Sequence, residues 1–291
     1  MIKGSTVALV TPMNEDGSIS WESLETLLEF HIDNGTQAII AVGTTGESAT
    51  LSISEHKAVI KFTVEYCEGR IPVIAGTGAN NTMEAVEFTR TAAEVGAHMT
   101  LSVVPYYNKP SQEGLYQHFK TIAQAADLPM MLYNVPGRTV TDMSNETVAR
   151  LSRIDNIVGL KDASADISRV QAIKSLAGQD FALYSGDDAT SLEFLLAGGD
   201  GVVSVTANVS PKAMQNMCMA AIEGNRELAE RLDSLLQPLH KNLFLESNPV
   251  PVKWALHQMG LIPPGIRLPL VPLAEQYHEP VRHALMESGV V

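Results

Sequence analysis

The sequence predicts a (β/α)8 barrel followed by a helical C-terminal region. Short apolar runs alternate eight times with amphipathic stretches within about 220 residues, as expected for parallel strands joined by helices. Gly35, Gly96 and Gly198 follow three of the amphipathic stretches, where a left-handed residue is needed to end a helix. A doubly wound open sheet shows the same alternation, so periodicity alone leaves it as an alternative.

Each predicted strand is a short, mostly apolar run, typical of strands buried on both faces of a parallel sheet. The predicted strands are 6–10, 38–42, 73–76, 100–104, 130–134, 158–161, 182–185 and 201–204. The predicted helices between and after them are 20–34, 54–68, 82–95, 112–126, 144–152, 166–176, 189–197 and 211–222. Ser54, Thr82 and Ser144 each place a hydroxyl near a following acid, so we expect them to cap helices.

Residues 225–291 contain no strand pattern. Periodic apolar residues predict helices at 227–242, 251–259 and 273–288. We therefore divide the chain into a catalytic barrel domain, 1–224, and a C-terminal helical domain, 225–291.

Composition limits the class of partner. The chain has 291 residues, of which 45% are hydrophobic and 18% charged, and its net charge of −13 argues against binding nucleic acid or an anionic membrane. No run approaches the roughly 20 apolar residues that span a bilayer. Cys67 and Cys218 lie far apart, which predicts neither a disulfide framework nor a metal site and fits a reducing cytoplasm.

Lys161 is the most informative single residue. It ends the apolar run Ile157-Val-Gly-Leu160, which predicts a buried strand. Burial penalises a charged amine, and a neutral amine is the nucleophile that forms a Schiff base with a carbonyl. For an isolated lysine, the simpler interpretation is a side chain that reaches solvent.

Other polar residues follow neighbouring strands and would meet at the same end of a barrel. Thr44 and Thr45, between two glycines, form either a tight turn or a pair of donors for a carboxylate. Tyr133 is either a core aromatic or a partner of Lys161. Arg138 is either a surface charge or a bidentate clamp for a carboxylate.

Three further features of the sequence give only weak evidence for a functional role. The Gly76-Thr-Gly-Ala-Asn80 run has Asn81 where a dinucleotide fingerprint needs its third glycine. Asp187 and Asp188 have no further ligands at metal spacing, so we expect helix capping or surface solvation there and no metal. Glu47 is either a base or an anchor for its loop.

Longer motifs carry a family resemblance over essentially the whole chain. They are Gly43-Thr-Thr-Gly-Glu-Ser-Ala-Thr-Leu51, Pro72-Val-Ile-Ala-Gly-Thr-Gly-Ala-Asn80, Pro105-Tyr-Tyr-Asn108, Tyr133-Asn-Val-Pro-Gly-Arg138, Gly159-Leu-Lys-Asp162, Ser185-Gly-Asp-Asp188 and Glu246-Ser-Asn-Pro-Val-Pro-Val-Lys-Trp254. With these motifs the chain resembles the dihydrodipicolinate synthase family, within the pyruvate-dependent class I aldolases. The Gly-Thr-Thr-Gly-Glu motif and the lysine point only to that wider superfamily, whereas Arg138 in its setting points to the synthases.

The resemblance implies a lyase of lysine biosynthesis that condenses pyruvate with L-aspartate-4-semialdehyde through an imine on Lys161. It also implies that Tyr133, Thr44 and Tyr107 relay protons, with Tyr107 supplied by a neighbouring subunit. Because a tyrosine is a poor base at neutral pH, such a relay requires a hydrogen-bonded chain. The remaining implied contacts are Thr45 for the pyruvate carboxylate, Arg138 for the semialdehyde carboxylate, and the turn at Gly186 with the backbone of Val203 in the pocket wall. The resemblance implies no metal and no organic cofactor.

The resemblance further implies a homotetramer, built as a dimer of dimers, that L-lysine inhibits. The matching residues of the lysine site are Ser48, Ala49, His56, Asn80, Glu84 and Tyr106. Ile53 stands where sensitive relatives often have histidine, so we expect weaker inhibition. Asp162 stands where relatives often have glutamate, which keeps the charge, so we expect little effect on the reaction.

Two other functions remain open at this point. An aldolase of the same superfamily, acting on N-acetylneuraminate or a 2-keto-3-deoxy sugar acid, would share Lys161 and Tyr133 but would not need Arg138. A non-catalytic sensor of a keto acid or lysine would not need a proton relay.

Overall fold

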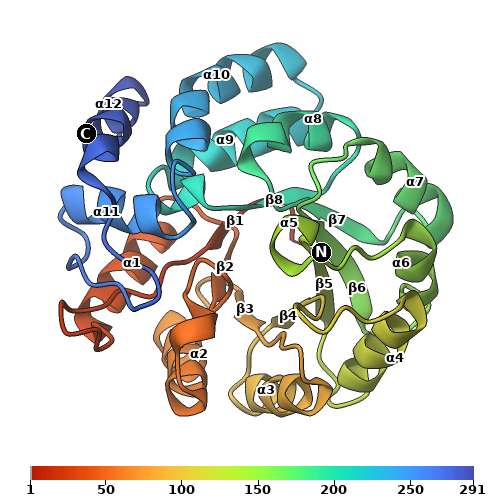
Figure 1. Cartoon of the computed structure of the whole chain (residues 1–291). Coiled ribbons are helices and arrows are strands. Elements are labelled where there is room, and N and C mark those ends of the chain that lie inside the picture. The colour runs from red at the N-terminus through yellow and green to blue at the C-terminus, as the bar shows by residue number, and fades with distance from the viewer. Residues whose placement is uncertain (1) are drawn as a thin grey trace.

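The computed structural model describes residues 2–291, and its eight parallel strands form a closed barrel. The first strand, β1 (Gly4–Ala8), pairs with β2 (Ala38–Ala41) on one side and with β8 (Gly201–Ser204) on the other, so that Thr6 lies opposite both Ala38 and Val203. This closure confirms the predicted (β/α)8 barrel and excludes the open sheet (Figure 1). The strands are β1 (Gly4–Ala8), β2 (Ala38–Ala41), β3 (Val73–Gly76), β4 (Met99–Val103), β5 (Met130–Asn134), β6 (Ile157–Asp162), β7 (Ala182–Ser185) and β8 (Gly201–Ser204).

In Figure 1 the helices surround the barrel, except α5 (Pro136–Thr139), which lies near the centre of the view. They are α1 (Trp21–Asp33), α2 (Ile53–Cys67), α3 (Thr82–Glu94), α4 (Gln112–Ala123), α5 (Pro136–Thr139), α6 (Asn145–Leu151), α7 (Ser168–Ala177), α8 (Ser191–Leu196) and α9 (Pro211–Ile222). Only α5 was not predicted, because one helical turn is too short to show a hydrophobic period.

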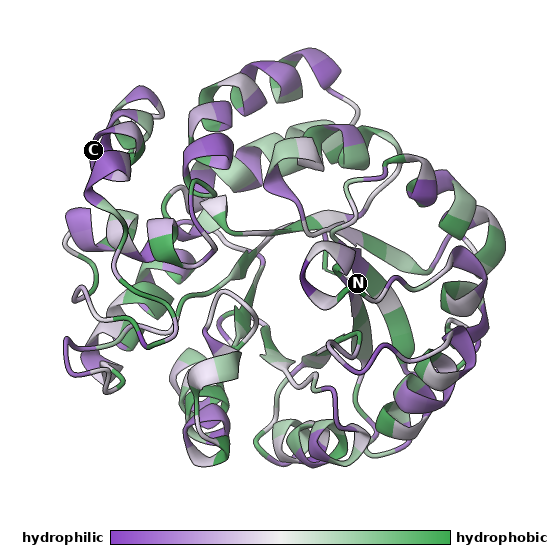
Figure 2. Cartoon of the chain, in the orientation of Figure 1, coloured by the Kyte–Doolittle hydropathy of each residue, from purple (hydrophilic) through white to green (hydrophobic). Residues whose placement is uncertain are grey.

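The hydrophobic core lies in two layers. Inside the barrel, alternate strand residues such as Ile40, Leu101, Tyr133 and Tyr184 form one buried cluster. Outside the barrel, the opposite strand faces pack against the helices. Figure 2 shows hydrophobic residues along the strands, and helices that carry both hydrophobic and hydrophilic residues.

Two of the three predicted helix caps are wrong by one or two residues. Ser144 caps α6 as expected, but Asn81 rather than Thr82 caps α3. In α2 the cap is Ser52 rather than Ser54, because Ser52 and Glu55 form a reciprocal capping box. Gly35, Gly96 and Gly198 have φ values of 75°, 84° and 107°, which confirms their left-handed conformations.

The C-terminal region contains α10 (Arg226–Asn242), α11 (Val250–Gln258) and α12 (His278–Glu287). Buried side chains of these helices, including Leu236, Val252 and Val281, belong to the same hydrophobic cluster as Val7 of β1. The division into domains at residue 224 stays a prediction. Among residues 2–291, no helix is both long and apolar enough to cross a bilayer.

Candidate active site

Lys161 and Tyr133 form the centre of the candidate site. They lie opposite each other on neighbouring strands, β6 and β5, and only 6% of each residue is exposed. The Nζ atom of Lys161 lies 4.0 Å from the centre of the Tyr133 ring. The tyrosine therefore forms one wall of the space around the amine.

Lys161 differs from the two other buried lysines in its partners. Lys174 forms an ion pair with Asp200 at 2.8 Å, and Lys253 pairs with Glu47. Within residues 2–291, no carboxylate lies within ion-pairing distance of Lys161. A buried amine without a counter-ion is available as a nucleophile.

Gly186 fixes the other side of the Lys161 side chain. It follows β7, and its main-chain N–H donates to the carbonyl of Asp162 at 2.7 Å. A Cβ atom at position 186 would lie 2.8 Å from Cε of Lys161 and 2.9 Å from Cβ of Ala163. The absence of a side chain at Gly186 therefore leaves the space that the lysine stem occupies.

The turn after β2 presents main-chain donors. The N–H groups of Thr44 and Thr45 have no acceptor among the hydrogen bonds of residues 2–291, an arrangement that suits a carboxylate. The turn begins at Val42, whose φ of 58° is unusual for a β-branched residue. Its carbonyl oxygen presses on Gly76, where a Cβ atom would lie only 2.2 Å away. Gly76 thus serves close backbone packing.

Thr44 and Thr45 face different surroundings. Thr44 lines two neighbouring cavities, one of about 30 Å³ that also contacts Tyr133 and one of about 240 Å³ that also contacts Arg138. Thr45 is 2% exposed, and its hydroxyl accepts a hydrogen bond from Nδ2 of Asn248 at 2.9 Å. The Thr45 side chain is thus directed toward the C-terminal region.

Arg138 lies in the single-turn helix α5, directly after β5. Its side chain is exposed at the mouth of the larger cavity, and Nη2 donates to the carbonyl of Asn248 at 3.2 Å. Val203 lies in β8 with its side chain in the buried barrel interior. Tyr107 is the candidate that this chain does not bring to the site, since it is 90% exposed and lines neither cavity.

The larger cavity also contains most residues of the candidate lysine site. Ser48, Ala49, Ile53, His56, Glu84 and Tyr106 line it. Asn80 does not line it, but its side chain donates to the carbonyl of Tyr106 at 3.3 Å. The cavity therefore reaches from the Thr44 and Arg138 side to the α2–α3 side of the barrel mouth.

His56 and Tyr106 have altered titration behaviour in this cavity. Burial lowers the pKa of His56, whose Nε2 lies 2.7 Å from the carbonyl of Gly76 and whose ring stacks on Phe88 at 4.0 Å. Burial, and then the charge of Glu84, raise the pKa of Tyr106. A neutral imidazole and a neutral phenol thus line the cavity at neutral pH.

A buried ion pair accounts for Glu47. Its carboxylate pairs with Lys253 of α11 and accepts from the main-chain N–H of Arg267 at 3.4 Å. Burial lowers the pKa of Lys253, and the nearby Glu47 charge opposes that shift. The structure favours the interpretation of Glu47 as an anchor for its loop.

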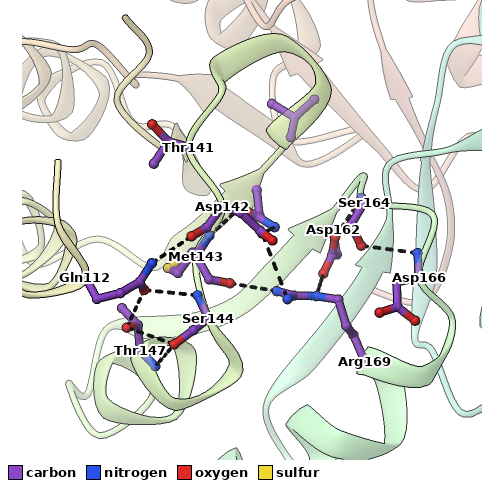
Figure 3. Close-up of polar contacts among 12 residues, drawn as sticks. Gln112, Thr141, Asp142, Met143, Ser144, Thr147, Asp162, Ser164, Asp166 and Arg169 are labelled. Atoms are coloured by element: carbon purple, nitrogen blue, oxygen red, sulfur yellow. Dashed lines mark hydrogen bonds and ion pairs between the residues drawn. The ribbon is translucent and has the colours of Figure 1, made fainter. Parts of the chain in front are cut away.

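Figure 3 shows a second polar network, which includes the residues that follow Tyr133 and Lys161 in the sequence. Their successors Asn134 and Asp162 are also paired across β5 and β6. Asp162 accepts from Nε of Arg169 at 2.6 Å, and Nη2 of Arg169 donates to the carbonyl of Met143 at 2.8 Å. The Asn134 amide binds Asp142 and the N–H of Met143 at 2.8 and 3.0 Å. This network ties both strand ends to the loop that leaves α5.

The residues that sequence analysis did not assign are Asn248, Lys253 and Arg169. Only Lys253 left a local signal, as a charged residue among the apolar residues of a short predicted helix. Asp187 and Asp188 instead accept main-chain and hydroxyl hydrogen bonds, and no metal-binding group of side chains occurs in residues 2–291.

Comparison with known proteins gives consistent matches along the chain. The model of the Dihydrodipicolinate synthetase family matches residues 1–288. A 4-hydroxy-tetrahydrodipicolinate synthase from Thioalkalivibrio sulfidiphilus (strain HL-EbGR7) is 61% identical over 290 residues, which cover 100% of this chain and 99% of the relative. One from Ectopseudomonas mendocina (strain ymp) is 59% identical over 291 residues, with 100% of both chains covered.

Solved structures agree with these matches. A chloride-inhibited dihydrodipicolinate synthase from Acinetobacter baumannii, complexed with pyruvate, superposes with a TM-score of 0.98 at 56% identity and 100% coverage of both chains. A synthase from Cyanidioschyzon merolae with lysine bound gives a TM-score of 0.96 at 42% identity, covering 100% of this chain and 99% of the other. A monomeric dihydrodipicolinate synthase variant gives 0.96 at 44% identity, covering 100% and 98%.

The barrel, the unpaired lysine at the end of β6 and these matches define a lyase of the aldolase type. The chain belongs to the dihydrodipicolinate synthetase family.

Proposed function

We propose that this enzyme condenses pyruvate with L-aspartate-4-semialdehyde to form 4-hydroxy-tetrahydrodipicolinate, the first committed step of diaminopimelate and lysine biosynthesis. The observation that carries the proposal is the unpaired, buried Lys161 beside Tyr133, in a chain 61% identical to a synthase of that name.

The reaction begins when the amine of Lys161 attacks the keto carbon of pyruvate and water leaves, which gives an imine. Loss of a proton from the methyl group gives an enamine, whose carbon forms a bond to the semialdehyde carbon. The substrate's own amine then attacks the imine carbon, closes the ring and releases Lys161. Tyr133, Thr44 and Tyr107 move the protons between these steps.

Two anion contacts orient the substrates. The free N–H groups of Thr44 and Thr45 receive the pyruvate carboxylate, and the Arg138 guanidinium receives the semialdehyde carboxylate. Gly186 and Val203 shape the wall around the imine. No cofactor takes part in this scheme.

We also propose a cytoplasmic homotetramer arranged as a dimer of dimers. Tyr107 is 90% exposed, which fits a residue that acts in a neighbouring subunit. Ile53 and Met83, at the starts of α2 and α3, are 50% and 63% exposed and provide apolar surface for a subunit contact. Cys67 and Cys218 are buried free thiols, which fits a reducing compartment.

L-lysine binding in the larger cavity is part of the proposal. Glu84 offers a carboxylate to an α-amino group, and Ile53 makes one edge apolar, so we expect inhibition that is weaker than in histidine-bearing relatives. Calorimetric titration with L-lysine measures this binding directly, and no heat at millimolar concentration would contradict it.

Borohydride reduction with pyruvate, followed by peptide mass spectrometry and a turnover assay with the semialdehyde, tests the proposed reaction. We expect a pyruvate-sized adduct on Lys161 together with turnover, and neither in Lys161→Ala. An adduct without turnover would instead favour a sugar-acid aldolase, or a keto-acid sensor if those acids are not cleaved. The absence of an adduct would remove the proposal.

A further inference from the structure

Asn248 joins two parts of the candidate site that are far apart in the sequence. Thr45 follows β2 and Arg138 follows β5, yet both contact this one residue from the C-terminal region. The amide Nδ2 of Asn248 donates to the Thr45 hydroxyl at 2.9 Å, and its main-chain carbonyl accepts from Arg138 at 3.2 Å. The side chain and the main chain of Asn248 thus serve different partners.

The contact with Thr45 determines which groups of the turn face the cavity. Because the hydroxyl of Thr45 is bound to Asn248 and is buried, this side chain does not enter the cavity. The Thr44 side chain and the two free N–H groups of the turn are then left for a ligand. Without Asn248 the Thr45 side chain would be free to rotate, and the turn would lose its fixed orientation.

Stabilisation of the fold is a poor explanation for this asparagine. Asn248 is only 6% exposed, and its amide oxygen has no hydrogen-bond partner within residues 2–291. An unsatisfied buried acceptor costs free energy of folding. An apolar residue would avoid that cost, but it would have no donor for Thr45.

The segment that carries Asn248 is itself held against the same turn. Lys253, one turn into α11, forms the buried ion pair with Glu47, which lies two residues after Thr45. The N–H of Lys253 donates to the carbonyl of Pro249 at 3.0 Å, which links the ion pair to the residue next to Asn248. The position of Asn248 relative to the turn is therefore fixed from two sides.

We propose that Asn248 is a positioning residue for both substrates. Its side-chain amide holds the Thr44–Thr45 turn so that the main-chain donors receive the pyruvate carboxylate, and its carbonyl orients Arg138 for the semialdehyde carboxylate. This inference depends on the proposed function, and it assigns the C-terminal region a direct part in the site.

Steady-state kinetics of Asn248→Ala test the inference, because alanine removes the amide and keeps the carbonyl. We expect the KM for pyruvate to rise about five- to tenfold, as for the loss of one positioning hydrogen bond. The KM for the semialdehyde should stay within about twofold, since Arg138 keeps its main-chain acceptor. A purely structural role would lower the melting temperature and change both KM values together.

Coupling to Thr45 provides the second readout. Thr45→Val removes the hydroxyl at nearly constant volume, so adding Asn248→Ala to it should have little further effect on the KM for pyruvate. Asn242→Ala is the matched control, because that amide binds only Pro238 within its own helix.

Unchanged pyruvate kinetics in Asn248→Ala, or additive effects in the double variant, would overturn the inference. Absence of turnover in the unmodified enzyme would instead overturn the proposed function.

Discussion

Lys161 combines two properties that are rarely found together in a folded protein. It is buried, yet it has no counter-ion within residues 2–291, whereas Lys174 and Lys253 are both paired. Its amine lies over the Tyr133 ring, and its aliphatic stem lies beside Gly186. Contacts with small or neutral neighbours therefore define the position of the reacting nitrogen.

Gly186→Ala should impair catalysis and also lower the stability of the fold slightly. The added Cβ would lie 2.8 Å from Cε of Lys161, whose flexible side chain can move, and 2.9 Å from Cβ of Ala163, which can move only with its backbone. Displacing the nucleophile by part of an ångström should slow turnover roughly ten- to a hundredfold. Gly137→Ala is the control, because nothing lies within 4 Å of its new methyl group. Turnover assays and thermal melts measure both effects, and normal turnover in Gly186→Ala would show that the lysine stem is not confined there.

At the scale of elements, polar clamps keep the C-terminal ends of the strands in place. Arg169 of α7 binds the end of β6 through Asp162 and the α5–α6 loop through Met143, as Figure 3 shows. The side chains of Asp162 and Arg169 are only 5% and 11% exposed. A buried ionic contact thus helps to hold the strand ends that carry the two catalytic candidates, Tyr133 on β5 and Lys161 on β6.

Arg169→Met should therefore destabilise the protein strongly, by about 3–5 kcal/mol, because it leaves the Asp162 carboxylate buried without its partner. Adding Asp162→Asn to Arg169→Met should recover part of this loss. Arg226→Met, which breaks the exposed pair with Glu230, should cost less than about 1 kcal/mol. Urea unfolding measures all of these free energies. Similar costs for Arg169→Met and Arg226→Met would show that burial adds nothing to the first pair.

The elements differ in how well the sequence predicts them. The barrel and Lys161 are predictable because a buried strand has a local apolar pattern, and parallel strands place their ends together. The cap of α2 was misplaced because Ser52 and Ser54 both carry a hydroxyl near its start, and the reciprocal bonds between Ser52 and Glu55 decide between them. The role of Asn248 was not predictable, because it depends on a contact with Thr45 across a sequence separation of 203 residues.

At the scale of the whole molecule, buried histidines make the fold sensitive to acid. Burial lowers the pKa of His31 to about 3 and that of His118 to about 4. Both rings stay neutral in the folded chain, but in the unfolded chain they take up protons below their ordinary pKa of about 6.5. The unfolded state then binds more protons, so stability is lost as the pH falls below that value.

Between about pH 7.5 and about pH 5, each of these histidines should reduce the free energy of unfolding by about 2 kcal/mol. The pKa of Glu55 is lowered to about 2, mainly by hydrogen bonds from Arg267. Glu55 therefore changes the free energy of unfolding only at lower pH, where its carboxylate takes up a proton in the unfolded chain. Urea unfolding at both pH values measures the difference. His31→Leu and His118→Leu should each flatten the pH dependence, whatever their own effect at neutral pH. An unchanged slope in both variants would contradict the assignment.

The proposed assembly can be tested through Tyr107, which is 90% exposed and lies in neither cavity. If Tyr107 acts in the site of a neighbouring subunit, as we propose, a single chain does not contain a complete site. Lys161→Ala and Tyr107→Phe subunits, each nearly inactive alone, should then complement each other. In a mixed dimer, the Tyr107→Phe subunit keeps Lys161 and receives Tyr107 from its partner.

Random mixing should give about a quarter of the unmodified activity, because half of the dimers are mixed and each has one intact site. Co-expression with two affinity tags isolates the mixed species. If Tyr107 served its own chain, no mixed dimer would hold both residues in one site, and the activity would stay at the level of the parent variants.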